Sequence, residues 1–231
     1  MPPLAIIYDV HGNTPALEAV LADAREAGAA RFLLGGDYAL FGPFPAEAIA
    51  LLRGLDDALW VRGNVDRWTA QPDRLSDGDD LLPRAVADTR EAIGGPAAAE
   101  LGELPERQVL DGTLYCHASP LSDMRSFMPE AGEDDEQLLA GAGERRVVFG
   151  HTHLQFNRTG PDGVELLNPG SVGLPFDGDA RAAYALAHDD GSIELRRVAY
   201  DQQAAIDALQ QRFGGVPWAQ RSITRLQNAR P

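Results

Sequence analysis

Five short polar fragments each follow directly on an apolar run, and this repeated pattern constrains the fold of the chain more than any other feature. The fragments are Asp9-Val10-His11-Gly12-Asn13, Gly36-Asp37, Gly63-Asn64, His117 and Gly150-His151-Thr152-His153. The apolar runs have the length and composition of buried β-strands. Four of the five histidines of the protein fall inside the fragments. Because loops of α/β sheets meet beyond the carboxyl ends of their strands, the pattern predicts that the fragments share one site.

Helical segments separate the first apolar runs. The Thr14-Pro15 pair predicts a helix start, with a capping hydroxyl followed by proline at the first helical position. Residues 45–52 are expected to form the next helix. Strands are expected at residues 4–8, 31–34 and 58–61. This alternation predicts parallel strand pairing with helices packed outside the sheet.

The second half of the chain is less regular. Residues 68–107 predict a helical insertion whose polar stretch, 71–80, is a solvated loop or, alternatively, a lid. The C-terminal extension 201–231 is expected to be helical, although its tail from 214 could fray. Further strands are expected at 109–116, 146–149 and 164–167, a turn at 168–171, a short helix at 134–139, and a hairpin of 182–186 with 192–200. Without an internal repeat or low-complexity linker, residues 1–231 predict a single domain.

Composition limits the partners. The formal net charge of −15 disfavours general nucleic-acid binding, because an acidic surface repels the phosphate backbone, but a small phosphorylated substrate remains possible. The single cysteine, Cys116, excludes an intrachain disulfide. We see no signal peptide and no apolar stretch of the ~20 residues that a membrane span needs, so we expect a cytoplasmic protein. A homo-oligomer remains possible, since the C-terminal helices could pack within the chain or across a partner.

The residue types in the fragments are those of metal ligands. Asp9 and His11 lie two residues apart, and His151 and His153 repeat this spacing. Carboxylates and neutral imidazoles suit divalent cations such as Mn²⁺, Fe²⁺ or Zn²⁺, while the absence of a thiolate set excludes a structural zinc ribbon. Taken singly, each fragment could be only a turn or a surface histidine. The ordered set favours a pair of divalent metal ions at the sheet edge.

The ordered motifs Asp-x-His-Gly-Asn, Gly-Asp, Gly-Asn-x-Asp, His and Gly-His-Thr-His resemble those of the calcineurin-like metallophosphoesterases. The likeness runs over residues 9–179, most of the chain. The turn at 168–173 and the segment 177–186 look like the small single-domain bacterial branch of that family. The resemblance implies an α/β fold of four αββα layers, with two mixed sheets packed face to face.

The resemblance also implies a role for each matching residue. One metal would be held by Asp9, His11 and His153, the other by Asn64, His117 and His151, with Asp37 bridging the two. Asn13 would lie in the outer shell or contact phosphate, and Asp66 would belong to the catalytic set. We expect Mn²⁺, with Fe, Zn, Ni or Mg possible. The implied reaction is hydrolysis of a phosphoester by a metal-bridging hydroxide, without a phospho-enzyme.

Two features depart from the family pattern. Many members carry a histidine between the asparagine and aspartate of the third fragment, where this chain has Val65. Losing a general acid costs ~10²–10⁴-fold, less for a good leaving group, so we expect a phosphodiesterase for a small nucleotide or related metabolite. Leu174 and Phe176 stand where related sequences often have polar or basic residues, so a substrate-contacting arginine is missing or the pocket is more apolar. The alternatives are a phosphomonoesterase, including a protein phosphatase, and a catalytically silent interaction scaffold.

Overall fold

Two five-stranded mixed sheets pack face to face in the computed structural model, which describes residues 1–75 and 80–231. The first sheet has the order β10-β9-β1-β2-β3, and the second has the order β4-β5-β6-β8-β7. The strands of the first sheet are β1 (Leu4–Ile7), β2 (Arg31–Leu34), β3 (Ala58–Trp60), β9 (Ala182–Ala187) and β10 (Ile193–Val198). Those of the second are β4 (Arg107–Leu110), β5 (Thr113–Cys116), β6 (Arg146–Val148), β7 (Gln155–Thr159) and β8 (Glu165–Pro169).

Apolar strands in the middle of each sheet explain the pairing. β1 is buried at all four positions and pairs in parallel with β2, as the alternation of strands and helices predicted. β5, β6 and β8 pair in parallel in the second sheet, with antiparallel β4 and β7 on either side, while antiparallel β9 flanks one side of the first parallel core. Between the sheets lies an apolar layer that includes Ile6, Leu33, Tyr115, Val148 and Leu167. Truncating one such buried leucine or isoleucine to alanine would cost about 2–5 kcal/mol.

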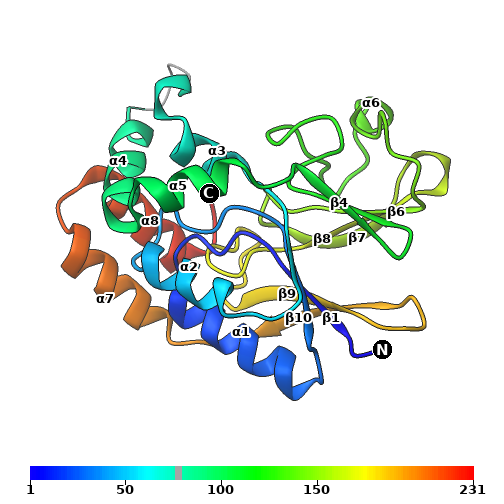
Figure 1. Ribbon diagram of the computed structural model, residues 1–231, viewed down its shortest axis with the longest axis horizontal. Helices are drawn as coiled ribbons and strands as arrows, with labels where there is room; N and C mark the ends of the chain where they lie inside the picture. Colours follow the sequence, from blue (N-terminus) through cyan, green and yellow to red (C-terminus); the bar gives the residue numbers. More distant parts are fainter. Residues whose placement is uncertain (76–79) are drawn as a thin grey trace.

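Helices cover the first sheet more fully than the second. α1 (Thr14–Glu26) and α2 (Pro45–Arg53) pack on the outer face of the first sheet (Figure 1). The outer face of the second sheet carries one helical turn, α6 (Asp135–Leu138), and an apolar cluster around Phe127 and Phe149. The four-layer αββα arrangement is therefore confirmed, with one thin outer layer.

The remaining helices gather at one end of the sheets. They are α3 (Asn64–Ala70), α4 (Leu82–Ile93), α5 (Gly95–Gly102), α7 (Gln202–Phe213) and α8 (Pro217–Asn228). The 3₁₀ turn η1 (Pro72–Arg74) lies between α3 and α4, and η2 (Pro161–Gly163) lies between β7 and β8. Figure 1 shows α3, α4 and α5 beside the C-terminal pair α7–α8 at the left end of the molecule. These two segments, far apart in sequence, pack together through a buried cluster that includes Val86, Leu209, Trp218 and Leu226. The predicted loop at 71–80 lies partly outside the described residues.

Two local predictions were wrong, and one strand was missed. Residues 109–116 do not form one strand: β4 and β5 form an antiparallel hairpin around Asp111-Gly112, both with positive φ (51° and 74°), as a two-residue primed turn requires. β7 was not predicted, because its residues are mostly polar and only half-buried. The predicted turn at 168–171 begins later, since β8 continues through Pro169. Pairing between neighbouring strands decides each of these, and the hydrophobic pattern alone did not show it.

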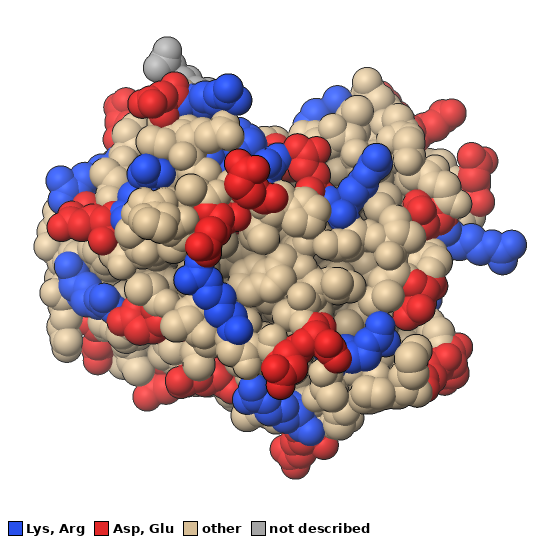
Figure 2. Space-filling model, viewed as in Figure 1, with Lys and Arg blue, Asp and Glu red and all other residues tan. Residues whose placement is uncertain are grey.

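The described helices are all too short or too polar to cross a bilayer. On the face in Figure 2, arginine and carboxylate side chains alternate over the surface. Surface ion pairs include Arg53–Glu100 and Arg125–Asp134, and each contributes about 0–1 kcal/mol in such exposed positions.

Candidate metal centre

All five fragments end at one edge, beyond the carboxyl ends of strands from both sheets. Asp9 and Asp37 follow β1 and β2, while Asn64 is the first residue of α3 after β3. His117 follows β5 directly, and the 150–153 fragment follows β6. The parallel cores of the two sheets point the same way, so loops of both contribute to one site. The sequence therefore predicted the location of this constellation correctly.

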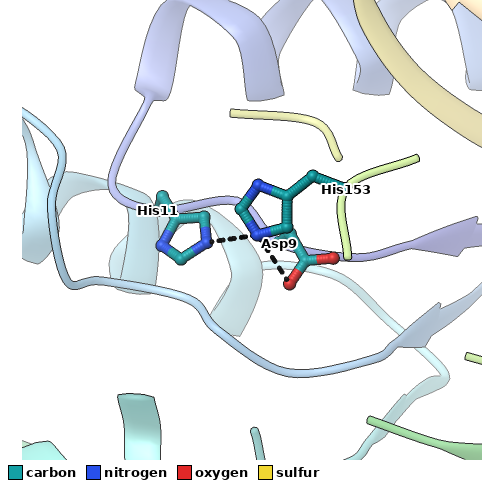
Figure 3. A group of neighbouring side chains, drawn as sticks. All are labelled: Asp9, His11 and His153. Atoms are coloured by element: carbon teal, nitrogen blue, oxygen red, sulfur yellow. Dashed lines mark hydrogen bonds and ion pairs between the residues drawn. The ribbon is translucent and has the colours of Figure 1, made fainter. Parts of the chain in front are cut away.

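Asp9, His11 and His153 form the first cluster, shown in Figure 3. The three side chains are buried, and their ligand atoms all lie within 4.8 Å of one another. His153 Nε2 lies 3.5 Å from Asp9 Oδ1 and 3.1 Å from His11 Nε2. Two imidazoles and a carboxylate at this spacing can hold a divalent cation.

Asp37, His117 and His151 form the second cluster. The amide oxygen of Asn64 lies 2.9 Å from His117 Nε2 and 2.9 Å from His151 Nδ1, so it faces the same point. Asp37 reaches both clusters: its Oδ1 is 3.3 Å from His117 Nε2, and its Oδ2 is 3.9 Å from His11 Nε2. One carboxylate thus directs one oxygen to each cluster, which is the placement that a bridging ligand requires.

Backbone carbonyls orient three of the imidazoles. The Nδ1 atoms of His11, His117 and His153 lie 2.9, 2.9 and 2.5 Å from their carbonyl partners. These partners are the carbonyls of Leu40, Gly35 and Leu174. Because a carbonyl only accepts, each Nδ1 carries a proton, which leaves Nε2 as the nitrogen that can bind a metal. Such a partner fixes the tautomer that a metal needs.

Asp9 supplies a direct test of whether a cation fits. Its Oδ2 accepts from the backbone N–H of His151 at 3.0 Å. Its Oδ1 is buried and accepts no hydrogen bond from any described residue. Burial therefore raises the pKa of Asp9 well above its usual value. A buried oxygen without a donor is costly, and a cation bound by the first cluster would satisfy it.

The backbone of the fragments is strained at the ligands themselves. Positive φ angles occur at Asp9 (55°), His11 (48°), Asp37 (61°), His151 (68°) and His153 (59°). Non-glycine residues rarely adopt this region, at a cost of about 1–3 kcal/mol each where the fold enforces it. Such strain collects where side-chain direction serves function, and the sequence offered no signal of it.

Glycines beside the ligands permit the close approach of the loops. A Cβ on Gly63 would lie 2.0 Å from Asp37 Oδ1, and one on Gly150 would lie 2.5 Å from Asp9 Oδ2. The glycine that precedes the ligand in these two fragments is therefore required by space, since only hydrogen fits against the carboxylates.

Comparisons with known proteins agree with this geometry. The profile described as "Calcineurin-like phosphoesterase superfamily domain" matches residues 3–191. The chain belongs to this superfamily. It is therefore a metal-dependent phosphoesterase, a hydrolase of phosphate esters, with two candidate metal-binding clusters.

Relatives resemble this phosphoesterase over nearly its full length. An uncharacterized protein of Methanocaldococcus jannaschii, MJ0912, is 28% identical over 89% of this chain and 91% of its own. The crystal structure of a metallophosphoesterase from Sphaerobacter thermophilus superposes with a TM-score of 0.83 at 26% identity, covering 99% of both chains. The hypothetical protein PH1004 from Pyrococcus horikoshii OT3 gives a TM-score of 0.85 at 20% identity over 98% of both chains, a likeness of fold alone.

Asp66 of the phosphoesterase holds the backbone of the site together. Its carboxylate accepts from the N–H groups of Asp37 (2.9 Å), Tyr38 (3.2 Å) and Gly63 (2.8 Å). Burial and the nearby Asp37 charge raise the pKa of Asp66 to about 7. Both of its oxygens face the protein, so the geometry favours a positioning role over the predicted place in the catalytic set.

Asn13 also faces the protein. Its Oδ1 accepts from the Ala16 N–H at 3.3 Å and caps α1, a place that the sequence assigned to the Thr14 hydroxyl. Its Nδ2 donates to the Gly173 carbonyl at 2.9 Å and to the Tyr200 hydroxyl at 3.2 Å. Each polar atom of the Asn13 side chain therefore has a protein partner, which favours the outer-shell role over phosphate contact.

The 168–171 segment supports the ligand loops. Asn168 Nδ2 donates to the Gly150 carbonyl at 2.9 Å and to Thr152 Oγ1 at 3.0 Å. Ser171 Oγ donates to the Asp9 carbonyl at 2.7 Å. These two residues fix the backbone beside three ligands, and sequence analysis did not identify their partners.

A pocket of about 390 Å³ lies against both clusters. Apart from ligands, its lining is mostly apolar and includes three aromatic side chains, Phe41, Trp68 and Phe176. The Phe176 ring stacks on the His153 imidazole, with centroids 4.4 Å apart and planes at 18°. The rest of the lining is His11, Asp37, Asn64, Val65, Leu82, Met124, His151, His153, Leu174 and Arg225. Sequence analysis anticipated the apolar character at Leu174 and Phe176, but not Phe41 or Arg225.

Proposed function

We propose that this phosphoesterase is a phosphodiesterase for a small nucleotide or related metabolite. The observation that carries the proposal is the pocket over the two clusters. Its volume lies in the range of small-ligand sites, and its walls are apolar and aromatic. Flat aromatic walls suit the stacking of a nucleobase or another aromatic substituent of the phosphate.

The proposed ligand sets follow the two clusters. One cation is held by Asp9, His11 and His153, the other by Asn64, His117 and His151, and Asp37 contacts both. The unpartnered Asp9 Oδ1 and the inward Nε2 atoms support this assignment. Nitrogen and oxygen ligands without thiolate suit Mn²⁺, and they also accept Fe, Zn, Ni or Mg. A silent scaffold does not need seven competent side chains gathered in two adjacent clusters.

Two bound cations would activate water and neutralise charge on the reacting phosphoryl group. The chain contributes position: backbone carbonyls fix the imidazoles, and Asp66 fixes the loops of Asp37 and Gly63. Apolar side chains line the space over the clusters. Positioning and charge neutralisation carry most of phosphoryl transfer.

The leaving group distinguishes a diester from a monoester. Val65, only 2% exposed, stands in the lining where a proton donor would assist departure. Among the described lining residues, every imidazole and carboxylate belongs to the metal-ligand set. Arg225 does not lose its proton, so it cannot act as the general acid. A general acid contributes ~10²–10⁴-fold, so its absence penalises poor alkoxide leaving groups most. This supports diesters with a good leaving group over alkyl monoesters.

The proposal is tested by comparing rates on bis(4-nitrophenyl) phosphate and 4-nitrophenyl phosphate after metal removal and reloading with Mn²⁺. We expect the ratio of kcat/KM values to favour the diester and turnover to depend on the metal. A preference for the monoester would establish the phosphomonoesterase alternative. No metal-restored turnover on either ester would favour the scaffold.

A further inference from the structure

Arg225 is the one arginine among the described residues that line the pocket. It lies on α8, beyond residues 3–191 that the superfamily profile matches. The C-terminal helices thus bring a positive charge to a site whose ligands all come from the shared core. No motif in the sequence linked Arg225 to that site.

Contacts at both ends hold α8 in place. At its start, Trp218 Nε1 donates to buried Asp88 Oδ2 at 2.8 Å. Near its end, the Leu226 carbonyl accepts from Gln202 Nε2 at 2.6 Å, and the Ala229 carbonyl accepts from the Gly178 N–H at 2.9 Å. The last bond joins the helix end to the loop that carries Phe176. The location of Arg225 is therefore built into the fold.

A stack of side chains connects Arg225 to the first cluster. Its guanidinium carbon lies 5.5 Å from the centre of the Phe176 ring, within cation–π distance, and that ring stacks on His153. Only one aromatic ring therefore separates the guanidinium from a ligand of the first cluster.

We propose that Arg225 binds the anionic phosphoryl oxygens of the substrate and so supplies, from α8, the cation that the turn at Leu174 and Phe176 lacks. The inference rests on the proposed function and deepens it. A guanidinium presents paired N–H donors that match two phosphate oxygens, and its flat face remains on Phe176. The substrate is thereby an ester whose charged phosphoryl group lies between Arg225 and the clusters, with its organic group on the aromatic walls.

The test measures inorganic phosphate binding to the metal-loaded protein by calorimetry, together with KM and kcat for bis(4-nitrophenyl) phosphate. Arg225→Met keeps an apolar stem to pack on Phe176 but removes the charge. We expect phosphate affinity to fall by about tenfold or more, KM to rise by a similar factor, and metal content to stay at the wild-type level. Arg225→Lys should lie between. Arg221→Met, one turn away on the exposed side of α8 and outside the pocket lining, is the matched control and should bind phosphate normally.

Wild-type phosphate affinity in folded, metal-loaded Arg225→Met would overturn the inference, as would an equal loss in Arg221→Met. If Arg225→Met loses bound metal as well as phosphate affinity, Arg225 supports the metal cluster and the inference is also wrong. If Arg225→Met does not fold, Arg225→Gln is judged by the same criteria. If phosphate binding depends on Arg225 but the protein does not hydrolyse diesters, the proposed function is wrong and the role of Arg225 stands.

Discussion

The Nε2 atoms of His11 and His153 lie 3.1 Å apart, although 142 residues separate the two histidines in the chain. Both Nδ1 atoms face backbone carbonyls, so two Nε2 lone pairs point at one another inside a buried site. Without a cation or proton between them this arrangement is repulsive. The fold therefore brings together groups that a bound ion stabilises.

Metal should raise the stability of the protein by mass action, because the clusters exist only in the folded chain. At a free metal concentration of ~100 Kd for one site, the gain is about 2.7 kcal/mol, or a Tm rise of roughly 5–10 °C. Thermal unfolding of chelator-treated protein with and without Mn²⁺ measures it. An unchanged Tm would show that the clusters bind no metal.

Asp37→Asn should reduce kcat by at least ~10²-fold while leaving the fold intact, since it removes the charge shared between the clusters. Bound metal should fall from two ions per chain. Metal analysis and diester kinetics measure both effects. Asp207→Asn, on the exposed side of α7, is the control and should behave as wild type. Wild-type turnover in Asp37→Asn would show that the bridge is misassigned.

Metal binding should release at least one proton at neutral pH. Burial lowers the pKa of His117, but Asp37 and Asp9 outweigh it and raise the value to about 10 in the metal-free protein. The protonated His117 ring thus contributes its full stabilisation of the metal-free fold below pH ~6.5, the ordinary pKa of an unfolded histidine. This stabilisation is lost as the pH rises through the pKa of His117 in the folded protein. Metal affinity should rise about tenfold per pH unit between these limits. Calorimetry in buffers of different ionisation enthalpy detects the proton, and identical heats would contradict the prediction.

Gly63→Ala should damage the site more than a generic helix mutation, because the new Cβ would stand 2.0 Å from Asp37 Oδ1. We expect metal loss and a drop in unfolding free energy of about 1–3 kcal/mol. Gly95→Ala, at the start of α5 with open space around its Cβ, should be neutral or stabilising by up to ~1 kcal/mol. Chemical denaturation and metal analysis of both variants give the comparison. Equal behaviour would refute the space argument.

Val65→His should shift selectivity toward monoesters, because it places a proton donor in the pocket lining. We expect the monoester-to-diester ratio of kcat/KM to rise at least ~10-fold. Val65→Asn, similar in size but unable to protonate a leaving group, is the control. A folded, metal-loaded histidine variant with an unchanged ratio would show that leaving-group protonation does not set the preference.

The sequence by itself determined where the ligands stand, because each fragment ends an apolar run and strand direction carries it to one edge. It also determined the apolar character at Val65, Leu174 and Phe176, which depends on residue type alone. Local patterning was enough for these features, since strand burial and ligand chemistry both depend on the types of residues that are neighbours in the sequence.

Only the tertiary structure decided the rest. The protein partners of Asp66 depend on contacts between segments distant in sequence, and the Asp111-Gly112 hairpin and β7 depend on how neighbouring segments pair. Positive φ at ligands such as His151 is enforced by packing and not by residue type. Arg225 reaches the pocket because α8 folds back over the loop of Phe176, and a contact across so many residues leaves no periodic trace in the sequence.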